Sequence, residues 1–341
     1  MARANPMTGT EIKTTAGFAA GYRAGRNGAA LHDESNHGRL WLAGADRVAF
    51  LQRMTTNDVR LQPGQGTVTV LTSPTARIVC MFTVLTQPEG LLLLAGPDQG
   101  AAAYNALRSQ IFFGDQVTLE GRGSALAQMG LYGPQAAQIL AAAGLDPEAA
   151  SLQPFAWREV QLDGRPVTVQ ANEGLGRRGY TLLADADAAQ VLRTALLEAG
   201  AMPLPEDAYQ VLRVEAGVPA PGYELTDRVS PLEAGLRRFC NDHKGCYTGQ
   251  EIIARQITYD KVTTHLVGLL PFQAVPPEAT VEAGGRQVGY VTSSLHSVAR
   301  DRPVALAYVR RPHHEPGTQV TVVTAGRKVP AQVVSLPLVE P

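Results

Sequence analysis

Apolar residues recur along the chain at two spacings, and these spacings predict its secondary structure. Alternation of apolar and polar residues predicts strands, which we expect at residues 39–42, 67–72, 77–86, 91–95, 124–131, 160–171 and 180–183. Apolar residues at every third or fourth position predict helices, which we expect at residues 46–54, 99–111, 135–143, 188–199 and 205–216. The strands and helices do not alternate regularly. This order favours an α+β fold over a doubly wound parallel sheet.

Two short motifs predict where further helices begin. Ser230 and Glu233 have the spacing of a capping box, in which the side chain of each residue bonds the backbone N–H of the other. Thr248 and Glu251 have the same spacing. We therefore expect one capped helix after Ser230 and another that begins at Gly249.

The pattern changes after residue 261, where short strands are separated by turns rich in proline and glycine. We expect these strands at residues 266–270, 288–292, 304–309, 320–323 and 331–335. Many short strands with almost no helical pattern are typical of a separate antiparallel barrel or sandwich. The chain is thus expected to divide into a loosely ordered lead-in (1–30), a main α+β region (31–260) and a C-terminal β domain (261–341).

Composition and charge narrow the class of protein. A chain of 341 residues is long for a single core. Its net charge of −1 disfavours broad nucleic-acid binding, which needs a basic face. Three cysteines are too few for a disulfide framework, and no apolar run reaches the length of a membrane span. We therefore expect a cytoplasmic protein without direct nucleic-acid or membrane partners.

Cys246 is the strongest candidate for chemistry. It lies just before the expected helix start, where unpaired backbone N–H groups and the helix dipole favour an anion. Lys244 is close in sequence, so this setting favours the thiolate, the form that attacks electrophiles. The alternative is a buried, inert cysteine. The polar residues around the thiol favour a functional site.

Two carboxylates are candidates for binding a ligand. Glu215 falls in the last turn of the helix expected at residues 205–216, where the helix dipole disfavours a negative charge. A ligand that donates hydrogen bonds to the acid would explain that position. Glu224 lies in the loop that follows. For both residues the alternative is an ordinary solvated acid.

A metal site is the remaining possibility from residue spacing. Cys240, His243 and Cys246 follow a C-x2-H-x2-C pattern. Zinc normally takes four ligands, and the chain has no matching second pair. We therefore expect no bound metal, and a metal carrier stays open as a minor alternative.

The segment from Lys244 to Arg255 resembles a known family signature. It reads K-G-C-Y-T-G-Q-E-I-I-A-R and is similar to the K-G-C-[YF]-x-G-Q-E-x-x-A-R motif of the YgfZ family, which consists of relatives of the glycine-cleavage T-protein, an aminomethyltransferase. The similarity continues in other segments and covers roughly residue 31 to the end. These segments are residues 46–59, 212–217, 230–236, 289–293 and 305–309.

The resemblance implies T-protein-like domains around a central folate pocket, followed by a C-terminal antiparallel β-barrel. It implies tetrahydrofolate or a derivative as the cofactor. Glu215 matches the position where T-proteins hold the pterin ring with a carboxylate. Asn57 matches a turn that faces the pocket, and Cys246 matches the thiol that distinguishes the YgfZ family.

The resemblance also assigns supporting roles around the pocket. Lys244 would help to keep Cys246 ionised. Gln250, Glu251 and Arg255 would shape and brace the loop, with Glu251 and Arg255 paired one helical turn apart. Together with Glu224, we count these three residues among those expected at the folate site.

The chain departs from T-proteins where their amine-transfer chemistry needs carboxylates. The acidic pair of T-proteins falls on Cys80 and Met81, and a further glutamate falls on Thr181. Without these acids, electrostatic stabilisation of charge on the folate amine is missing. The resemblance therefore argues against a classical aminomethyltransferase.

Three functional hypotheses remain. The leading one is a tetrahydrofolate-binding accessory protein that supports assembly or repair of iron–sulfur clusters in client proteins, including tRNA-modifying enzymes, through a thiol at the pocket rim. The second is a folate-dependent, aminomethyltransferase-like one-carbon transferase in which Cys246 is the nucleophile. The third is the Cys/His metal carrier.

Overall fold

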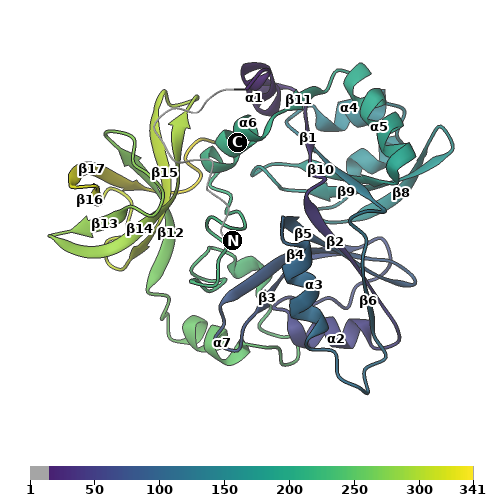
Figure 1. Ribbon diagram of the computed structural model, residues 1–341, viewed down its shortest axis with the longest axis horizontal. Helices are drawn as coiled ribbons and strands as arrows, with labels where there is room; N and C mark the ends of the chain where they lie inside the picture. Colours follow the sequence, from purple (N-terminus) through teal and green to yellow (C-terminus); the bar gives the residue numbers. More distant parts are fainter. Residues whose placement is uncertain (1–14, 341) are drawn as a thin grey trace.

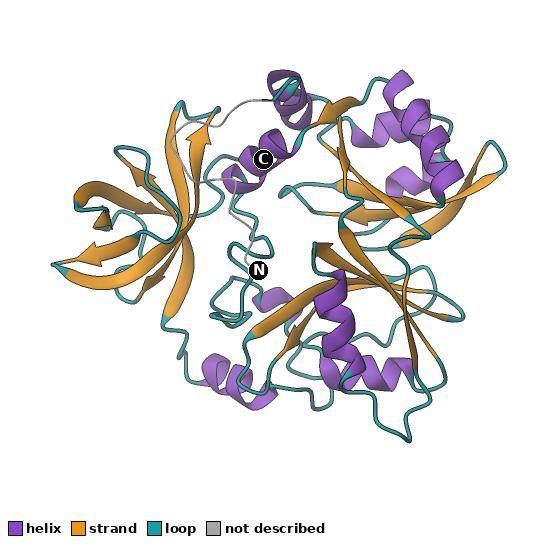
Figure 2. Cartoon of the chain, in the orientation of Figure 1, coloured by secondary structure: helices purple, strands orange, loops and turns teal. Residues whose placement is uncertain are grey.

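Three bodies surround a central loop segment in the computed structural model, which describes residues 15–340. Two β-sheets with helices lie on one side and a β-barrel lies on the other (Figure 1). Between them runs the long stretch that follows the helix α6 (Glu206–Glu215) and ends at the helix α7 (Gln250–Thr258); Figure 2 shows it mostly as loop. The only regular element within it is a short 3-10 turn, η2 (Arg237–Phe239).

The first sheet has the strand order β3-β4-β5-β2-β6. Two helices, α2 and α3, pack against one of its faces, and their apolar residues share a core with those of the strands. The elements are β2 (His37–Ala43), α2 (Arg47–Met54), β3 (Gly66–Thr72), β4 (Ile78–Thr86), β5 (Gly90–Pro97), α3 (Gly100–Arg108) and β6 (Thr118–Gly121). The helices and long strands agree with the sequence prediction, whereas β6 was not predicted.

The second sheet has the strand order β11-β1-β7-β10-β9-β8, and α4 and α5 contribute to its core. Its strand β1 precedes the whole of the first sheet in sequence, and its other strands follow that sheet, so the two sheets are intertwined along the chain. The segment predicted as one strand at residues 160–171 is a hairpin. The elements are β1 (Ala30–Asp33), β7 (Ala127–Tyr132), α4 (Ala136–Ala142), η1 (Pro147–Ser151), β8 (Trp157–Leu162), β9 (Arg165–Asn172), β10 (Gly179–Ala184), α5 (Ala186–Glu198) and β11 (Met202–Leu204).

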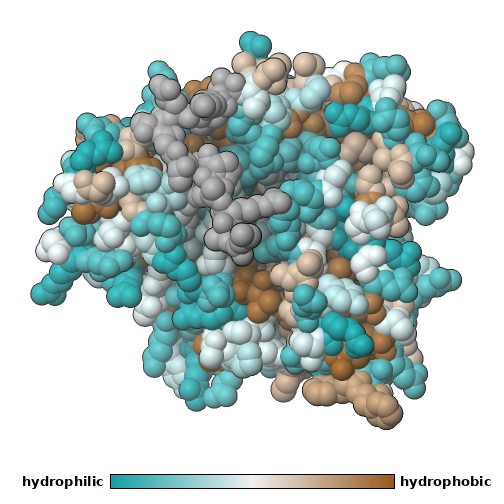
Figure 3. Space-filling view, in the orientation of Figure 1, coloured by the Kyte–Doolittle hydropathy of each residue, from teal (hydrophilic) through white to brown (hydrophobic). Residues whose placement is uncertain are grey.

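The C-terminal domain is a closed barrel with the strand order β12-β15-β14-β13-β16-β17. All its strand pairs are antiparallel, and a valine- and alanine-rich core fills it. The strands are β12 (Thr264–Pro271), β13 (Thr280–Ala283), β14 (Arg286–Ser297), β15 (Arg302–Arg310), β16 (Gln319–Thr324) and β17 (Arg327–Val334). The predicted α+β fold with a C-terminal antiparallel barrel is confirmed. Figure 3 shows that apolar residues lie in separate groups on the face it draws.

The predicted lead-in is wrong for the part of it that the structure describes. Residues Phe18–Asn27 form a helix, α1, which packs against α6; residues 1–14 lie outside the described part. Two glycines permit the close packing, since a Cβ at Gly21 would lie 2.7 Å from the carbonyl oxygen of Pro203, and one at Gly25 would lie 2.4 Å from Leu212. Gly21 and Gly25 are therefore packing positions of this helix.

Both capping-box predictions also need correction. Ser230 and Glu233 do exchange the two capping hydrogen bonds, at 3.3 and 2.7 Å, but the chain turns at Gly235 (φ 75°) and no α-helix follows. The helix α7 forms as predicted, but the capping box expected from Thr248 and Glu251 does not. Its N-cap is Gly249 (φ 81°), no side chain caps it, and its first residue is Gln250 instead of Gly249.

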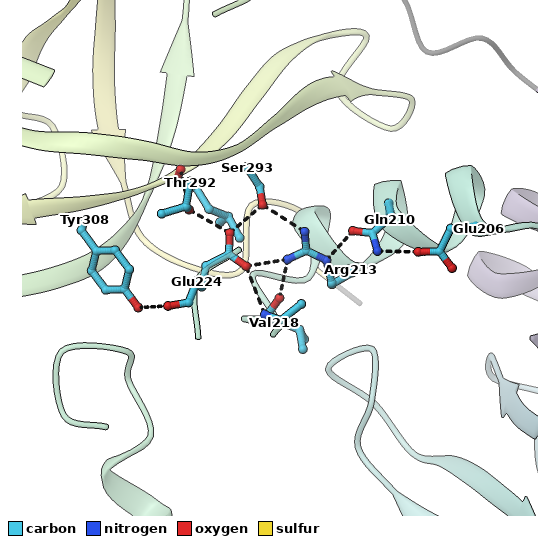
Figure 4. Close-up of polar contacts among 10 residues, drawn as sticks. Glu206, Gln210, Arg213, Val218, Glu224, Thr292, Ser293 and Tyr308 are labelled. Carbon is cyan, nitrogen blue, oxygen red and sulfur yellow. Dashed lines mark hydrogen bonds and ion pairs between the residues drawn. The ribbon is translucent and has the colours of Figure 1, made fainter. Parts of the chain in front are cut away.

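A buried ion pair connects α6 and the loop after it to the barrel (Figure 4). The guanidinium of Arg213 donates to the Glu224 carboxylate at 2.8 Å, and the side chains of both residues are at most 1% exposed. The same carboxylate accepts from the hydroxyls of Thr292 and Ser293, at 2.8 and 2.6 Å, and from the backbone N–H of Ala220 at 3.1 Å. Each oxygen of Glu224 thus has two donors. This network fixes the start of the central loop on β14.

Replacing Arg213 with Met should destabilise the protein strongly. The change leaves Glu224 as a buried charge without its partner, which typically costs about 3–5 kcal/mol. A matched control is Arg228→Met, which removes an exposed ion pair to Glu278 and a cation–π contact with Tyr290 and should cost less than about 2 kcal/mol. Urea unfolding followed by circular dichroism measures both changes. If the free energy of unfolding falls equally in the two variants, the buried pair has no special structural role.

Candidate functional site

The segment that carries Cys246 docks on the turn between α2 and β3. Backbone hydrogen bonds run from the N–H of Asn241 to the carbonyl of Thr56 at 2.9 Å, and from the N–H of Thr248 to the carbonyl of Arg53 at 3.1 Å. These contacts hold both sides of the loop. Cys246 lies between them and is exposed, so the alternative of a buried cysteine is wrong. The loop presents a free thiol from a fixed backbone.

Lys244 anchors this loop and brings two predicted site residues together. Its ammonium donates to the backbone carbonyls of Thr55 at 2.6 Å and Asn57 at 2.7 Å. The side chain is buried, and this burial lowers the pKa of Lys244 to about 8. The ammonium is thus used to hold the turn after α2. Its predicted effect on the ionisation of Cys246 stays a prediction.

Asn57 uses its side-chain amide to shape the same turn. The NH₂ group donates to the hydroxyl of Thr67 at 3.0 Å and to the carbonyl of Val68 at 2.9 Å, while the amide oxygen accepts from the N–H of Asp58 at 2.9 Å. Asn57 is half-buried. The structure places it beside Lys244, as a residue that orders the backbone around the loop of Cys246.

The remaining predicted residues of the signature lie on α7. Glu251 and Arg255 form the expected ion pair, at 2.9 Å, and both side chains are more than half exposed. Such a pair contributes only a few tenths of a kcal/mol to stability, about 0.3–0.5. Gln250 is half-buried at the first helical position. Binding of a ligand by these three residues stays a prediction.

Glu215 is buried, which excludes the solvated alternative. One carboxylate oxygen accepts from the hydroxyl of Tyr22 at 2.7 Å, and the other from Ser297 at 2.6 Å and from the N–H of Ala299 at 3.2 Å. Burial and this carboxylate raise the pKa of Tyr22 well above its usual value. Glu215 therefore links α1, α6 and the end of β14. Its predicted contact with a pterin ring stays untested; one carboxylate oxygen has two donors and the other has one.

Glu224 is likewise a buried structural acid and not a solvated one, as its network with Arg213 shows.

The three residues of the C-x2-H-x2-C pattern, Cys240, His243 and Cys246, differ strongly in their exposure to solvent. Cys240 is buried, which raises its pKa to about 11, whereas His243 and Cys246 are exposed. Among residues 15–340, no three His, Cys, Asp or Glu side chains are grouped to hold a metal ion. This arrangement disfavours the metal carrier.

Cys80 and Met81 point to opposite faces of the first sheet. Cys80 is part of the core shared with α2 and α3, and burial raises its pKa to about 12. Met81 is half-buried and packs with residues of the central loop, including Leu225 and Phe239. Of the two positions that resemble the T-protein acidic pair, only Met81 faces the central segment.

A cavity of about 540 Å³ lies between β2, α3 and the end of β6. We did not predict it from the sequence. None of the predicted site residues lines it. Next to it lies a buried polar cluster in which Gln128 donates to the Glu34 carboxylate at 2.8 Å and lies 3.3 Å from the ring of His37. The polar run from His32 to His37, directly before a predicted strand, was the available signal. The residues that line the cavity are Asn36, His37, Gly38, Arg39, Leu40, Asp98, Gly100, Ala101, Tyr104, Asn105, Gly121 and Gly123.

Comparison with known proteins identifies the family. The GCVT N-terminal domain model matches residues 6–244, and the glycine cleavage T-protein C-terminal barrel domain model matches residues 265–340. The chain belongs to the glycine cleavage T-protein family. The two matches cover the two-sheet region and the barrel. They support the broad resemblance found in the sequence.

Individual relatives of this T-protein-like chain agree with that assignment. It is 33% identical over 298 residues to a chloroplastic protein of Arabidopsis thaliana named as a candidate transferase, covering 87% of this chain and 68% of the relative. It is 33% identical over 319 residues to the aminomethyltransferase of Moorella thermoacetica, covering 92% and 87%. The solved aminomethyltransferase of Bartonella henselae superposes with a TM-score of 0.85 at 25% identity, covering 95% and 90%.

These relatives support the T-protein superfamily and not its finer YgfZ branch. They are named as aminomethyltransferases or as a transferase, and they give no support to an iron–sulfur or tRNA-related role. Along residues 15–340, no helix combines the length and the apolar character that a membrane crossing requires. A cytoplasmic location stays a prediction.

Replacing Lys244 with Ala should destabilise the loop that carries Cys246. The buried carbonyl of Thr55 and the half-buried one of Asn57 would lose their donor, which should lower the free energy of unfolding by about 1–3 kcal/mol. Lys261→Ala is the matched control, because Lys261 is exposed, and it should change stability by less than about 0.5 kcal/mol. Urea unfolding gives the free energy of unfolding of each variant. Limited proteolysis detects local loosening as faster cleavage in the segment between η2 and β12. If Lys244→Ala leaves both the free energy of unfolding and the rate of proteolysis unchanged, the ammonium does not hold the turn.

An acid should be tolerated at Met81 and not at Cys80. Cys80→Asp places a carboxyl group in the apolar core under α2 and α3, whereas Met81→Asp places it at the half-buried central face. We expect Cys80→Asp to be less stable than Met81→Asp by about 3 kcal/mol or more. Thermal unfolding of the two variants measures this difference. Similar melting temperatures would mean that both side chains reach water.

Proposed function

We propose that this T-protein-like chain is a folate-dependent transferase that acts on a one-carbon group carried by tetrahydrofolate. The observation that carries the proposal is the match of both sheets and the barrel to an aminomethyltransferase over 95% of the chain. The names of the relatives support transfer chemistry, and the family supports a folate as the carrier.

In this proposal Cys246 is the nucleophile that replaces the missing acids. Its thiol is exposed, and hydrogen bonds on both sides hold the backbone around it. A positioned thiol can accept a carbon electrophile without the carboxylates that amine transfer requires. Lys244 and Asn57 would act indirectly, by holding the loop in place. Gln250, Glu251, Arg255 and Glu224 are proposed as residues around the folate, with Glu224 acting through the loop that it fixes.

Replacing Cys246 with Ser tests the nucleophile. Calorimetric titration with tetrahydrofolate should show binding by both the wild-type protein and Cys246→Ser, within about 2-fold of each other, because the hydroxyl keeps the size of the thiol. Conversion of 5,10-methylenetetrahydrofolate to tetrahydrofolate, in the presence of an amine acceptor, should fall by more than about 100-fold in the variant. Undiminished turnover in Cys246→Ser would refute the nucleophile, and absence of folate binding by the wild type would refute the proposed carrier.

The proposed contact of Glu215 with the pterin ring needs an experiment that separates binding from folding. Because Tyr22 and Ser297 both donate to its carboxylate, Glu215→Gln alters structure as well as any ligand contact. Ser297→Ala is the matched variant, since it removes one donor and keeps the acid. We expect Glu215→Gln to weaken tetrahydrofolate binding at least about 10-fold, and Ser297→Ala to lower only the melting temperature. Equal affinities in the two variants would assign Glu215 a purely structural role.

The accessory role in iron–sulfur cluster maintenance remains a second candidate, and the exposed thiol is the observation that favours it. In that role the protein binds folate without turning it over, and Cys246 contacts a client or its cluster. Wild-type protein that binds tetrahydrofolate, lacks turnover and restores a cluster enzyme in cells, while Cys246→Ser does not, would support it. Restoration by Cys246→Ser would exclude it.

A further inference from the structure

We propose that His32 and Glu206 form a pH-sensitive switch, which holds the start of α6 on the second sheet while the ring of His32 is protonated and releases it when the proton leaves. The proposal does not rest on the proposed folate chemistry, because it concerns how one helix is held in the fold. Its basis is the hydrogen-bond partners of a buried ring and the charges that surround it.

Both ring nitrogens of His32 face hydrogen-bond acceptors. His32 lies on β1 and is 5% exposed. Its Nδ1 lies 3.0 Å from the carbonyl oxygen of Leu204, the last residue of β11, and its Nε2 lies 3.3 Å from a carboxylate oxygen of Glu206, the first residue of α6. A carbonyl and a carboxylate only accept hydrogen bonds, and a neutral imidazole has a single N–H. The ring therefore donates to both partners only as the imidazolium.

The two partners respond differently to loss of a proton. The carbonyl of Leu204 belongs to β11, which pairs directly with β1, so it stays beside the ring. The side chain of Glu206 is 65% exposed and can turn into solvent. A neutral ring that keeps its bond to the carbonyl presents a lone pair to the carboxylate. The proton that leaves is thus the one on Nε2, and the contact that breaks is the one with Glu206.

The groups that face His32 from the neighbouring elements favour a cation. The ring of Tyr209, on α6, stacks on it with 4.3 Å between ring centres, and Glu34, directly after β1, adds a negative charge. Burial and the charge of Glu34 raise the pKa of Tyr209 and Tyr132 well above the usual value, so both phenols are neutral. Burial lowers the pKa of His37, so that ring is neutral near pH 7. The other charged residues of this junction are Asp33, Arg193 and Arg213.

These contacts define the pH range of the switch. Burial by itself lowers the pKa of His32, but the hydrogen bonds to Glu206 and Leu204 and the charge of Glu34 outweigh it, so the pKa lies above the usual 6.5. A raised pKa means that the proton stabilises the folded protein fully below about pH 6.5, and that this stabilisation is lost as the pH rises through the folded-state pKa. Partial burial raises the pKa of Glu206, but its hydrogen bonds to His32 and Gln210 outweigh that effect and lower it. Glu206 therefore stays ionised while His32 titrates.

The switch acts on the helix that carries the buried ion pair (Figure 4). Glu206 accepts from the side-chain amide of Gln210 at 2.7 Å, and Gln210 accepts from the Nε of Arg213 at 2.8 Å. Arg213 in turn pairs with Glu224. Release of Glu206 from His32 thus loosens the first member of a chain of hydrogen bonds that runs along α6. We expect the effect to be largest in the first turns of this helix.

Two carboxylate-to-amide changes provide the test. Glu206→Gln removes the ionic partner of His32 at an exposed position, so the variant should fold. Asp301→Asn is the matched control, because Asp301 pairs with the exposed ring of His296 at 3.1 Å in the barrel. Amide hydrogen exchange of residues 208–214 is measured for the wild type and both variants at about pH 6 and about pH 8.5. Each rate is divided by the intrinsic rate at that pH, which leaves the local opening of α6.

We expect the first turns of wild-type α6 to open at least about 5-fold more often at the higher pH, because the loss of a charged hydrogen bond changes an opening equilibrium by that factor or more. Glu206→Gln should open readily at both pH values, with a difference of less than about 2-fold, and Asp301→Asn should behave as the wild type. The proposal is overturned if opening of wild-type α6 does not increase with pH, or if Glu206→Gln keeps the increase.

Discussion

The buried ion pair between Arg213 and Glu224 is the contact on which the arrangement of the three bodies depends. It joins α6, the first turn of the central loop and β14, beside an apolar core that α6 shares with the barrel. Four donors on one carboxylate compensate for its removal from water. Because two of these donors, Thr292 and Ser293, belong to the barrel, the network is complete only when the barrel is docked, and it favours that placement of the barrel.

The same device recurs at two other junctions, one between the central loop and the first sheet and one between α6, α1 and the barrel. Lys244 crosses to the carbonyls of Thr55 and Asn57, and Glu215 binds Tyr22 of α1 and Ser297 of the barrel. In each case a charged side chain from the centre of the chain is buried against a different body. The exposed thiol of Cys246 is thus carried by a loop whose position is set by distant elements. A site of this kind can be exposed and still well oriented.

Periodicity in the sequence was sufficient for the scaffold and insufficient for the site. It predicted the long strands, most helices and the barrel, because each buries one regular face. It failed at Ser230 and at α1, where the outcome depends on tertiary neighbours: the capping bonds form around a turn, and small residues serve close packing. The contact between Lys244 and Asn57 joins residues 187 positions apart, and spacing along the chain carries no signal for it.

For the two predicted acids the structure excludes one of the two alternatives that the sequence left open. From the sequence, Glu215 and Glu224 were either ligand-binding or solvated; both are buried and hydrogen-bonded inside the protein, so they are not solvated, and ligand binding stays a prediction. A carboxylate in a protein of this fold therefore cannot be assigned to the ligand from its position in a motif alone. The sulfur atoms follow a similar logic: Cys80 and Cys240 are buried, where the thiol form is favoured, and only Cys246 meets solvent. Exposure, more than motif, separates the one thiol of the three that is available for chemistry from those that pack.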